Sequence, residues 1–98
     1  MLRGEVWRYE LDASPRSRLM VLISSDGIND SPRPWLLGAE VVDTDPQDVL
    51  AMPIDGHGWV HAGIINRLYR PGLRERVDEL AVDARDRVDA LLRAALDL

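Results

Sequence analysis

The sequence predicts a mainly β protein, a small antiparallel β-barrel closed by a C-terminal α-helix, and three observations predict it. Short apolar segments alternate with turn residues over most of the chain, which is typical of small all-β domains. The apolar period then changes to that of a helix near the C-terminus. Finally, 98 residues of which 46% are hydrophobic suffice for one modest core, so residues 1–98 are expected to form a single domain.

Each expected strand has its own signal. Residues 5–11 alternate apolar and polar side chains, as a half-buried strand does. Residues 19–24 form a continuous apolar run, which predicts a central strand buried on both faces. Pro53 places the strand over 49–54 at an edge, or marks its end. The expected strands cover 5–11, 19–24, 35–42, 49–54 and 59–69 (the last as one strand or two), separated by turn-forming residues at 12–15, 27–34, 43–48, 56–58 and 71–72.

The last segment predicts an amphipathic helix. Its apolar residues recur at intervals of three and four, which places them on one face of a helix. Asp83 lies near the expected start, where a carboxylate suits both capping and the helix dipole. The apolar stripe consists of Ala84, Val88, Leu91, Leu92 and Ala95.

The formal net charge is −5, and all 12 basic residues are arginines. This acidic balance disfavours non-specific binding to nucleic acid, which depends on phosphate neutralisation. The charges are unevenly distributed, because residues 56–80 carry four arginines against three carboxylates, a net charge of +1. This pattern is compatible with an arginine-rich face, and equally with scattered arginines paired with nearby carboxylates in solvent.

The composition also excludes several classes of protein. The chain contains no cysteine, which excludes a disulfide framework and a zinc-finger site. No apolar run reaches the roughly 18 residues of a membrane span, and the N-terminus has no apolar signal-peptide core. We therefore expect a cytoplasmic protein that does not enter a membrane. A core this small also gains from oligomerisation.

Two stretches carry a resemblance to a known family. The first is Arg3-Gly4-Glu5-Val6-Trp7, followed after a loop by Arg18-Leu19 and an apolar strand. The second is Gly63–Tyr69 together with the later run Val88-Asp89-Ala90-Leu91. In this order they resemble the MazF/PemK growth-inhibitor toxins, part of a superfamily that includes CcdB. The resemblance covers nearly the whole chain and implies an SH3-like barrel that forms a two-fold dimer.

The resemblance implies the toxin of a type II toxin–antitoxin system, a metal-independent endoribonuclease that acts on single-stranded RNA. Its partners would be a cognate antitoxin and a second copy of the chain, with the RNA groove at the dimer interface and no cofactor. Two departures keep an alternative open, a catalytically degenerate or CcdB-like non-enzymatic protein with a protein target. The loop before Arg18 is short, and the third expected strand lacks the family's catalytic hydroxyl.

Arg18 and Thr44 are the candidate catalytic residues. Arg18 matches the family's catalytic arginine, whose permanent charge suits a phosphorane-like transition state; an ordinary strand-flanking charge is the other interpretation. A gapless count from Arg18 places Val41 or Val42 where the family has its hydroxyl. Thr44 reaches that place if the strand bulges by one or two residues. Otherwise its side chain caps its own turn, between two aspartates that repel phosphate.

The histidines and tryptophans have two interpretations each. His57 and His61 are four residues apart, a spacing that can bind a metal on a helix, but the glycines beside His57 favour a turn histidine and a strand histidine. Trp7, Trp35 and Trp59 are expected in the core or in an interface, because the chain has no phenylalanine. Base stacking is the alternative for these rings.

Overall fold

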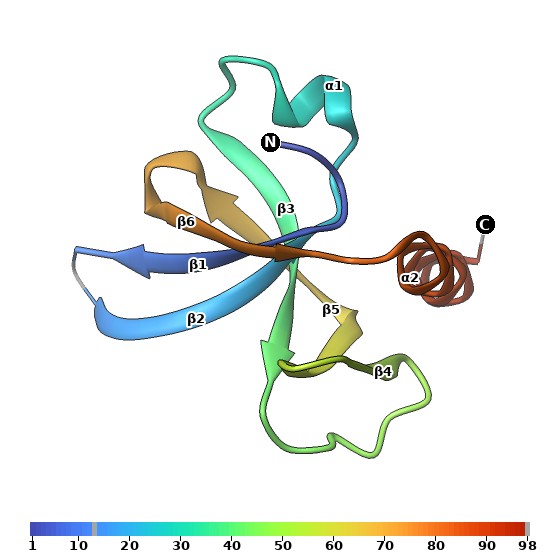
Figure 1. Ribbon diagram of the computed structural model, residues 1–98. Helices are drawn as coiled ribbons and strands as arrows, with labels where there is room; N and C mark the ends of the chain where they lie inside the picture. The colour runs from blue at the N-terminus through green and yellow to red at the C-terminus, as the bar shows by residue number, and fades with distance from the viewer. Residues whose placement is uncertain (13, 98) are drawn as a thin grey trace.

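The computed structural model describes residues 1–12 and 14–97. Six antiparallel strands form one sheet in the order β4-β5-β3-β2-β1-β6, and an α-helix follows at the C-terminus (Figure 1). The predicted mainly β fold with a C-terminal helix is confirmed. Within the described ranges, the edge strands β4 and β6 are not paired, so the barrel is open along one side. The elements are β1 (Glu5–Leu11), β2 (Ser14–Leu22), α1 (Asp26–Asn29), β3 (Trp35–Val42), β4 (Ala51–Ile54), β5 (Gly58–Tyr69), the 3-10 turn η1 (Arg70–Gly72), β6 (Leu73–Glu79) and α2 (Val82–Leu96).

Most strands lie where the sequence predicts them. β1 and β3 have the predicted bounds, and β5 is one continuous strand. Pro53 lies in β4, which is an edge strand as predicted. β2 starts at Ser14, inside the predicted turn at 12–15, of which Ala13 lies outside the described residues. The predicted loop at 27–34 contains most of α1, a short helix that Ser25 caps by accepting a hydrogen bond from the backbone of Ile28.

The sixth strand, β6, was not predicted. Six of its seven residues are exposed, and only Leu73 is buried. An exposed edge strand of this kind has no apolar alternation to reveal it, because its backbone pairs with β1 while most of its side chains stay in solvent. The sequence reads Leu-Arg-Glu-Arg-Val-Asp-Glu, and charged side chains protect an exposed edge from pairing with other chains.

The sheet has apolar side chains on both faces, which form two core clusters. β2 contributes alternately to each, so its continuous apolar run is buried on both faces as predicted. One cluster lies under α2 and contains Val6, Val21, Ile23, Ala39, Met52, Ile54, Val60, Ala62, Val88 and Leu92. The other lies on the opposite face and contains Tyr9, Met20, Leu22, Leu36, Leu68 and Leu73.

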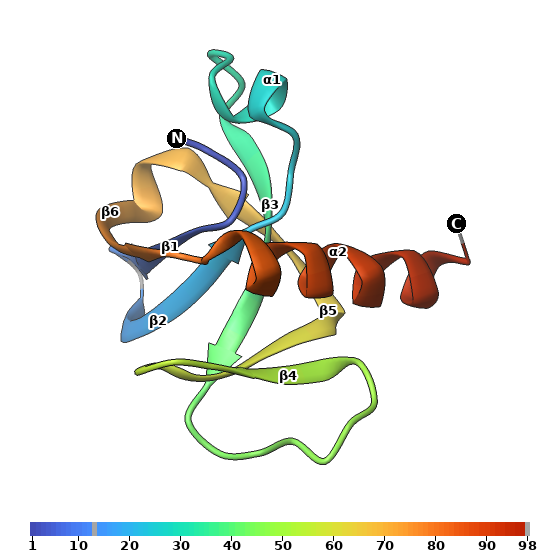
Figure 2. The same cartoon turned by 45° about the vertical axis from the view of Figure 1, so that its right-hand side comes forward.

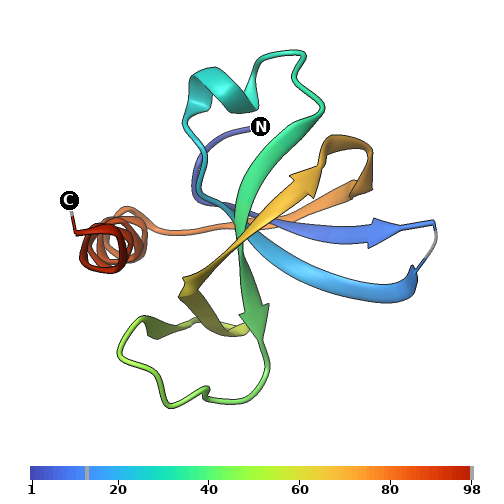
Figure 3. The same ribbon diagram turned by 180° about the vertical axis from the view of Figure 1, so that it is seen from behind.

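The helix α2 packs on the sheet through a narrow stripe. Val88 and Leu92 are buried, and Leu91 packs against the same cluster half-buried, whereas Ala95 is exposed, contrary to the prediction. Asp83 lies in the first turn, but Ala81 occupies the N-cap position, so the carboxylate suits the dipole without capping the helix. Figure 2 shows α2 lengthwise beside the strands, and Figure 3 shows from behind how β5 crosses β3. No helix in the described part of the chain is long and apolar enough to cross a membrane.

Candidate active site

Arg18 lies at the middle of β2, whose neighbours in the sheet are β1 and β3. In the β1–β2 ladder it is opposite Tyr9, and its guanidinium carbon lies 5.8 Å from the centroid of the Tyr9 ring. Its Nη1 is 3.9 Å from Oε1 of Glu40 on β3, and its side chain is 35% exposed. A guanidinium has five N–H donors. This single long ion pair therefore leaves donors available to a ligand.

Arg18 lines two separate hollows. The first, here named the aromatic groove, is lined by Tyr9, Leu11, Arg18, Trp35, Asn66, Arg67, Leu68 and Tyr69. The second, the β2–β3 hollow, lies at the end of the ladder between these strands, beyond the paired residues Leu19 and Val41. It is lined by Arg16, Ser17, Arg18, Leu19, Glu40, Val41, Val42, Asp43 and His57.

The aromatic groove presents two rings and a cation from neighbouring strands. Trp35 and Tyr69 are partners in the β3–β5 ladder, and their ring centroids lie 5.1 Å apart with the planes tilted by 52°. The guanidinium of Arg67 lies 4.0 Å from the centroid of the Trp35 ring, within the range of a cation–π interaction. Trp35 is 36% exposed and Tyr69 is 40% exposed. Both rings are therefore accessible to a planar ligand.

The charge of this groove is opposite to that of the whole chain. Arg18 and Arg67 both line it, and no acidic side chain is among the described residues around it. Within residues 1–12 and 14–97, Arg67 forms no ion pair with a carboxylate. Aromatic rings beside these cations suit a single-stranded nucleic acid, whose bases stack and whose phosphates carry negative charge.

The tryptophans are expected in the core or in an interface, and none of the three is fully buried in the core. Trp35 lies at the surface, where its ring lines the aromatic groove. Trp7 packs half-buried at the margin of the second core cluster, and Trp59 is half-buried on β5. The surface position of Trp35 leaves no distinct signal in the sequence, because an apolar ring at the start of a strand is equally typical of a core.

Thr44 lies at the surface, two residues beyond the end of β3. Its hydroxyl donates a hydrogen bond to Oδ1 of Asp43 at 3.3 Å, which is the local turn contact expected in the alternative interpretation. The β2–β3 ladder runs without a register shift from Leu19 and Val41 onward, so its continuation places Val42 opposite Arg18. Thr44 is not among the residues of either hollow that Arg18 lines. Its catalytic role stays a prediction.

Two histidine–aspartate pairs flank the β4–β5 hairpin. Nε2 of His57 lies 2.9 Å from Asp78 on β6, and Nε2 of His61 lies 2.9 Å from Asp48. The hydrogen bond from His57, followed by that from the backbone of Glu79, lowers the pKa of Asp78 below its ordinary value. The backbone of Leu50 and then His61 lower the pKa of Asp48 in the same way.

These pairs replace the metal-site interpretation of the two histidines. Each imidazole contacts a different carboxylate, and no cluster of three or more metal-ligating side chains occurs in the described part of the chain. His57 is a turn residue and His61 lies in β5, as the flanking glycines indicated. The pairing partners are 21 and 13 residues away in the sequence, so no local motif predicts them.

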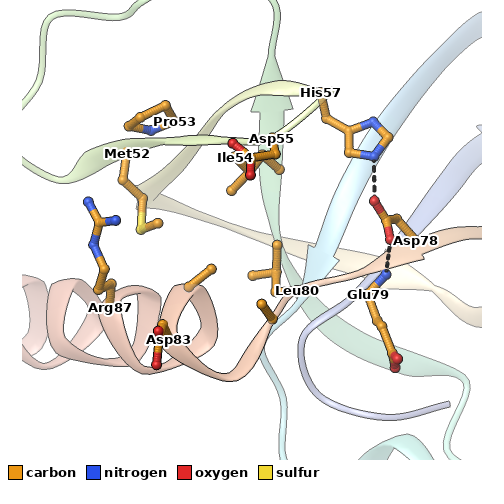
Figure 4. Close-up of a pocket in the computed structure, with 12 residues that line it drawn as sticks. Met52, Pro53, Ile54, Asp55, His57, Asp78, Glu79, Leu80, Asp83 and Arg87 are labelled. Atoms are coloured by element: carbon orange, nitrogen blue, oxygen red, sulfur yellow. Dashed lines mark hydrogen bonds and ion pairs between the residues drawn. The ribbon is translucent and has the colours of Figure 1, made fainter.

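The His57–Asp78 pair also bridges the open side of the barrel, because the hairpin belongs to one sheet edge and β6 is the other. Figure 4 shows the pair at one end of a third hollow, here named the β4–β6 seam, between the hairpin and α2. The seam is lined by Met52, Pro53, Ile54, Asp55, His57, Asp78, Glu79, Leu80, Ala81, Asp83, Ala84 and Arg87.

The fold has clear counterparts among solved structures, although no family model and no curated protein sequence matches the chain. An endoribonuclease from Mycobacterial species has a TM-score of 0.85 at 20% identity, over 100% of this chain and 92% of that chain. An endoribonuclease in complex with its cognate antitoxin, also from Mycobacterial species, has a TM-score of 0.88 at 20% identity, over 100% and 96% of the two chains. The MazE–MazF crystal structure (Form-I) from Deinococcus radiodurans has a TM-score of 0.84 at 16% identity, over 100% and 97%. The chain therefore has the MazF fold that its sequence resemblance implies.

Proposed function

We propose that this chain is the toxin of a type II toxin–antitoxin system, a metal-independent endoribonuclease that cleaves single-stranded RNA in the cytoplasm. Residues 1–98 would form one MazF/PemK/CcdB-like toxin domain. The fold supports this proposal, because similar structures over the full chain include endoribonucleases. The observation that carries it is the position of Arg18, which lies between a basic aromatic groove and a second, polar hollow.

Each of the two hollows would serve one part of the reaction. The aromatic groove holds the RNA, because Trp35 and Tyr69 offer ring faces to bases and Arg67 offers charge to phosphate. Arg18, at the border with the β2–β3 hollow, stabilises the negative charge that develops on the phosphate oxygens during cleavage. A fixed cation that is already in place at this position requires no reorganisation in the transition state.

The proposed partners are a cognate antitoxin and a second copy of the chain. Solved structures with this fold include an endoribonuclease with its antitoxin and MazE–MazF complexes. Large apolar side chains on β3 and β5 are exposed, among them Leu37 at 42%, Ile64 at 50% and Ile65 at 39%, and such a surface suits an interface. We expect a homodimer. Sedimentation at micromolar concentration that shows only an 11 kDa species would contradict it.

Cleavage of a long single-stranded RNA in EDTA tests the proposed activity. We expect wild type to cut, and Arg18→Ala to cut about a hundred- to a thousand-fold more slowly, the usual cost of removing a preorganised donor. Arg93→Ala on α2 is the matched control and is expected to retain activity. Thr44→Ala is expected to lose much less than Arg18→Ala.

Each other outcome changes the proposal in a defined way. If purified wild type cuts no RNA, the enzyme proposal falls and the CcdB-like binding protein becomes the leading interpretation. If Arg18→Ala cuts as fast as Arg93→Ala, the active site lies elsewhere. If Thr44→Ala is as inactive as Arg18→Ala, the loop after β3 rearranges to bring the hydroxyl to the RNA.

A further inference from the structure

The β2–β3 hollow holds more chemistry than Arg18 alone. Glu40 on β3 and His57 in the β4–β5 turn line the same hollow as Arg18, and Arg16 lines it too. A carboxylate, an imidazole and guanidinium groups are sufficient for proton transfer and charge stabilisation without a metal. The only hydroxyl side chain that lines this hollow, among the described residues, is that of Ser17.

Glu40 is held beside the cation. It lies in the middle of an otherwise apolar strand, opposite Met20 in the β2–β3 ladder. Its Oε1 is 3.9 Å from Nη1 of Arg18, and its side chain is 26% exposed. At this distance the carboxylate lies next to the guanidinium without a close hydrogen bond to it. It is therefore placed to accept a proton from a group bound at Arg18.

His57 is held in place from two directions. Gly58, the next residue, has a φ of +101°, and a Cβ at this position would lie 2.2 Å from the carbonyl oxygen of Val42. The turn therefore packs tightly against the end of β3. On the other side, Asp78 binds Nε2 at 2.9 Å and the imidazole is 19% exposed. With Nε2 engaged, Nδ1 is the nitrogen available to a ligand.

His57 lies between positively and negatively charged groups. The charged residues lining the two hollows that it borders are Arg16, Arg18, Glu40 and Asp43 in the β2–β3 hollow, and Asp55, Asp78, Glu79, Asp83 and Arg87 in the seam. Asp78 alone among them is hydrogen-bonded to the imidazole. This carboxylate fixes the orientation of the ring, as in other catalytic histidines that a third group orients.

We propose that Glu40 is the general base and His57 the general acid of RNA cleavage, with Asp78 as the positioning residue of His57. This inference rests on the proposed ribonuclease function. It explains how cleavage proceeds when the strand position opposite Arg18 carries Val42, which has no hydroxyl.

Cleavage is one displacement at phosphorus, with one proton transferred to Glu40 and one from His57. The RNA 2′-oxygen forms a bond to phosphorus while the 2′-hydroxyl proton passes to Glu40. The bond between phosphorus and the 5′-oxygen breaks, and this oxygen takes the proton from Nδ1 of His57. The products are a 2′,3′-cyclic phosphate and a 5′-hydroxyl. Glu40 is left protonated and His57 neutral, and proton exchange with water restores both residues.

The chain offers closely matched controls for both residues. His61 forms the same kind of pair with Asp48, at the same 2.9 Å, but it does not line the β2–β3 hollow. Glu75 pairs with Arg8 at 3.6 Å on the surface strand β6. We therefore compare His57→Gln with His61→Gln, and Glu40→Gln with Glu75→Gln. Removal of a general acid or base is expected to slow cleavage roughly a hundred- to ten-thousand-fold.

A substrate with a sulfur leaving group separates the acid from the base. The substrate is an oligonucleotide built around a junction that wild type cuts, with the 5′-oxygen of that junction replaced by sulfur. A thiolate leaves without a proton, because its conjugate acid is far stronger than an alcohol. We expect this substrate to restore His57→Gln to near the wild-type rate and to leave Glu40→Gln impaired. On the normal substrate, wild type should give a bell-shaped pH–rate profile, and on the sulfur substrate its basic limb should disappear.

The outcomes divide cleanly. If wild type cuts but His57→Gln matches His61→Gln, or the sulfur substrate fails to rescue a folded His57→Gln, the acid assignment is overturned. The Glu40 assignment is overturned if Glu40→Gln matches Glu75→Gln. If His57→Gln does not fold, the pH–rate profile of wild type on the sulfur substrate still tests the acid. A basic limb that persists in that profile overturns the assignment of His57 and leaves that of Glu40 standing. If wild type cuts no RNA, the proposed function fails as well, which distinguishes the two failures.

Discussion

The aromatic groove and the β4–β6 seam are hollows of similar size with opposite chemistry. The groove has a volume of about 390 Å³, two arginines and, among its described lining residues, no carboxylate. The seam has about 370 Å³ and four carboxylates, Asp55, Asp78, Glu79 and Asp83, against one arginine, Arg87. The net charge of −5 therefore does not say where a polyanion would bind. A phosphate backbone is attracted by local charge, and here the local charge differs in sign between the groove and the seam.

The two hollows also differ in the surfaces that they offer to a base. The groove exposes the rings of Trp35 and Tyr69, whereas the described lining of the seam is mainly aliphatic and acidic and includes no tryptophan or tyrosine. Stacking on aromatic rings tolerates any base, since every base has a π-face. The groove therefore suits a general single-strand contact, and the proton transfers belong in the neighbouring β2–β3 hollow.

Among substitutions that distinguish the groove from the seam, truncation of Trp35 should change RNA affinity the most. We expect Trp35→Ala to weaken binding of an uncleavable 2′-O-methyl RNA roughly 5- to 150-fold, since one base–aromatic stack has about this value. Trp35→Phe retains a ring and should recover much of the affinity. Fluorescence anisotropy with a dye-labelled oligonucleotide measures both. Equal affinities of wild type and Trp35→Ala would show that the groove does not stack bases.

Acid should weaken the His57–Asp78 pair at the seam without affecting the aromatic groove. The pKa of Asp78 is lower in the folded protein than its ordinary value of 3.8. The stability that the His57–Asp78 pair contributes is therefore present above pH 3.8 and is lost as the pH falls through the folded pKa. We expect Asp78→Asn to lower the melting temperature at pH 5.5, and this difference from wild type to shrink at pH 3. A difference that stays constant with pH would contradict the bridging role of the pair.

Much of the fold could be predicted from the sequence, because buried strands leave a local pattern. The apolar run of β2 identifies a strand with a core on each face, and the spacing of Val88 and Leu92 identifies the packed stripe of α2. The edge strand β6 could not be predicted, because its exposed, charged residues leave no periodic signal. Its position depends on pairing with β1, a contact between residues far apart in the chain.

The candidate site could be predicted only in part. Arg18 has a local signal, an arginine directly before an apolar strand, and the structure places it between two hollows. Glu40 and His57 join it only through the ladder between β2 and β3 and through the turn at Gly58, so no sequence spacing connects the three. Thr44 remains a predicted catalytic residue, because the resemblance expects a hydroxyl near the end of this strand.

The salt dependence of RNA binding tests most directly whether the groove, and not the seam, receives the substrate. Each phosphate contact on a single strand contributes about 0.7 to the slope of log affinity against log salt concentration. We compare Arg67→Gln in the groove with Arg87→Gln in the seam, which remove the same charge from two different hollows. The slope for 2′-O-methyl RNA is expected to fall by about 0.7 in Arg67→Gln and to stay unchanged in Arg87→Gln. An unchanged slope in Arg67→Gln, or an equal fall in both variants, would contradict the account.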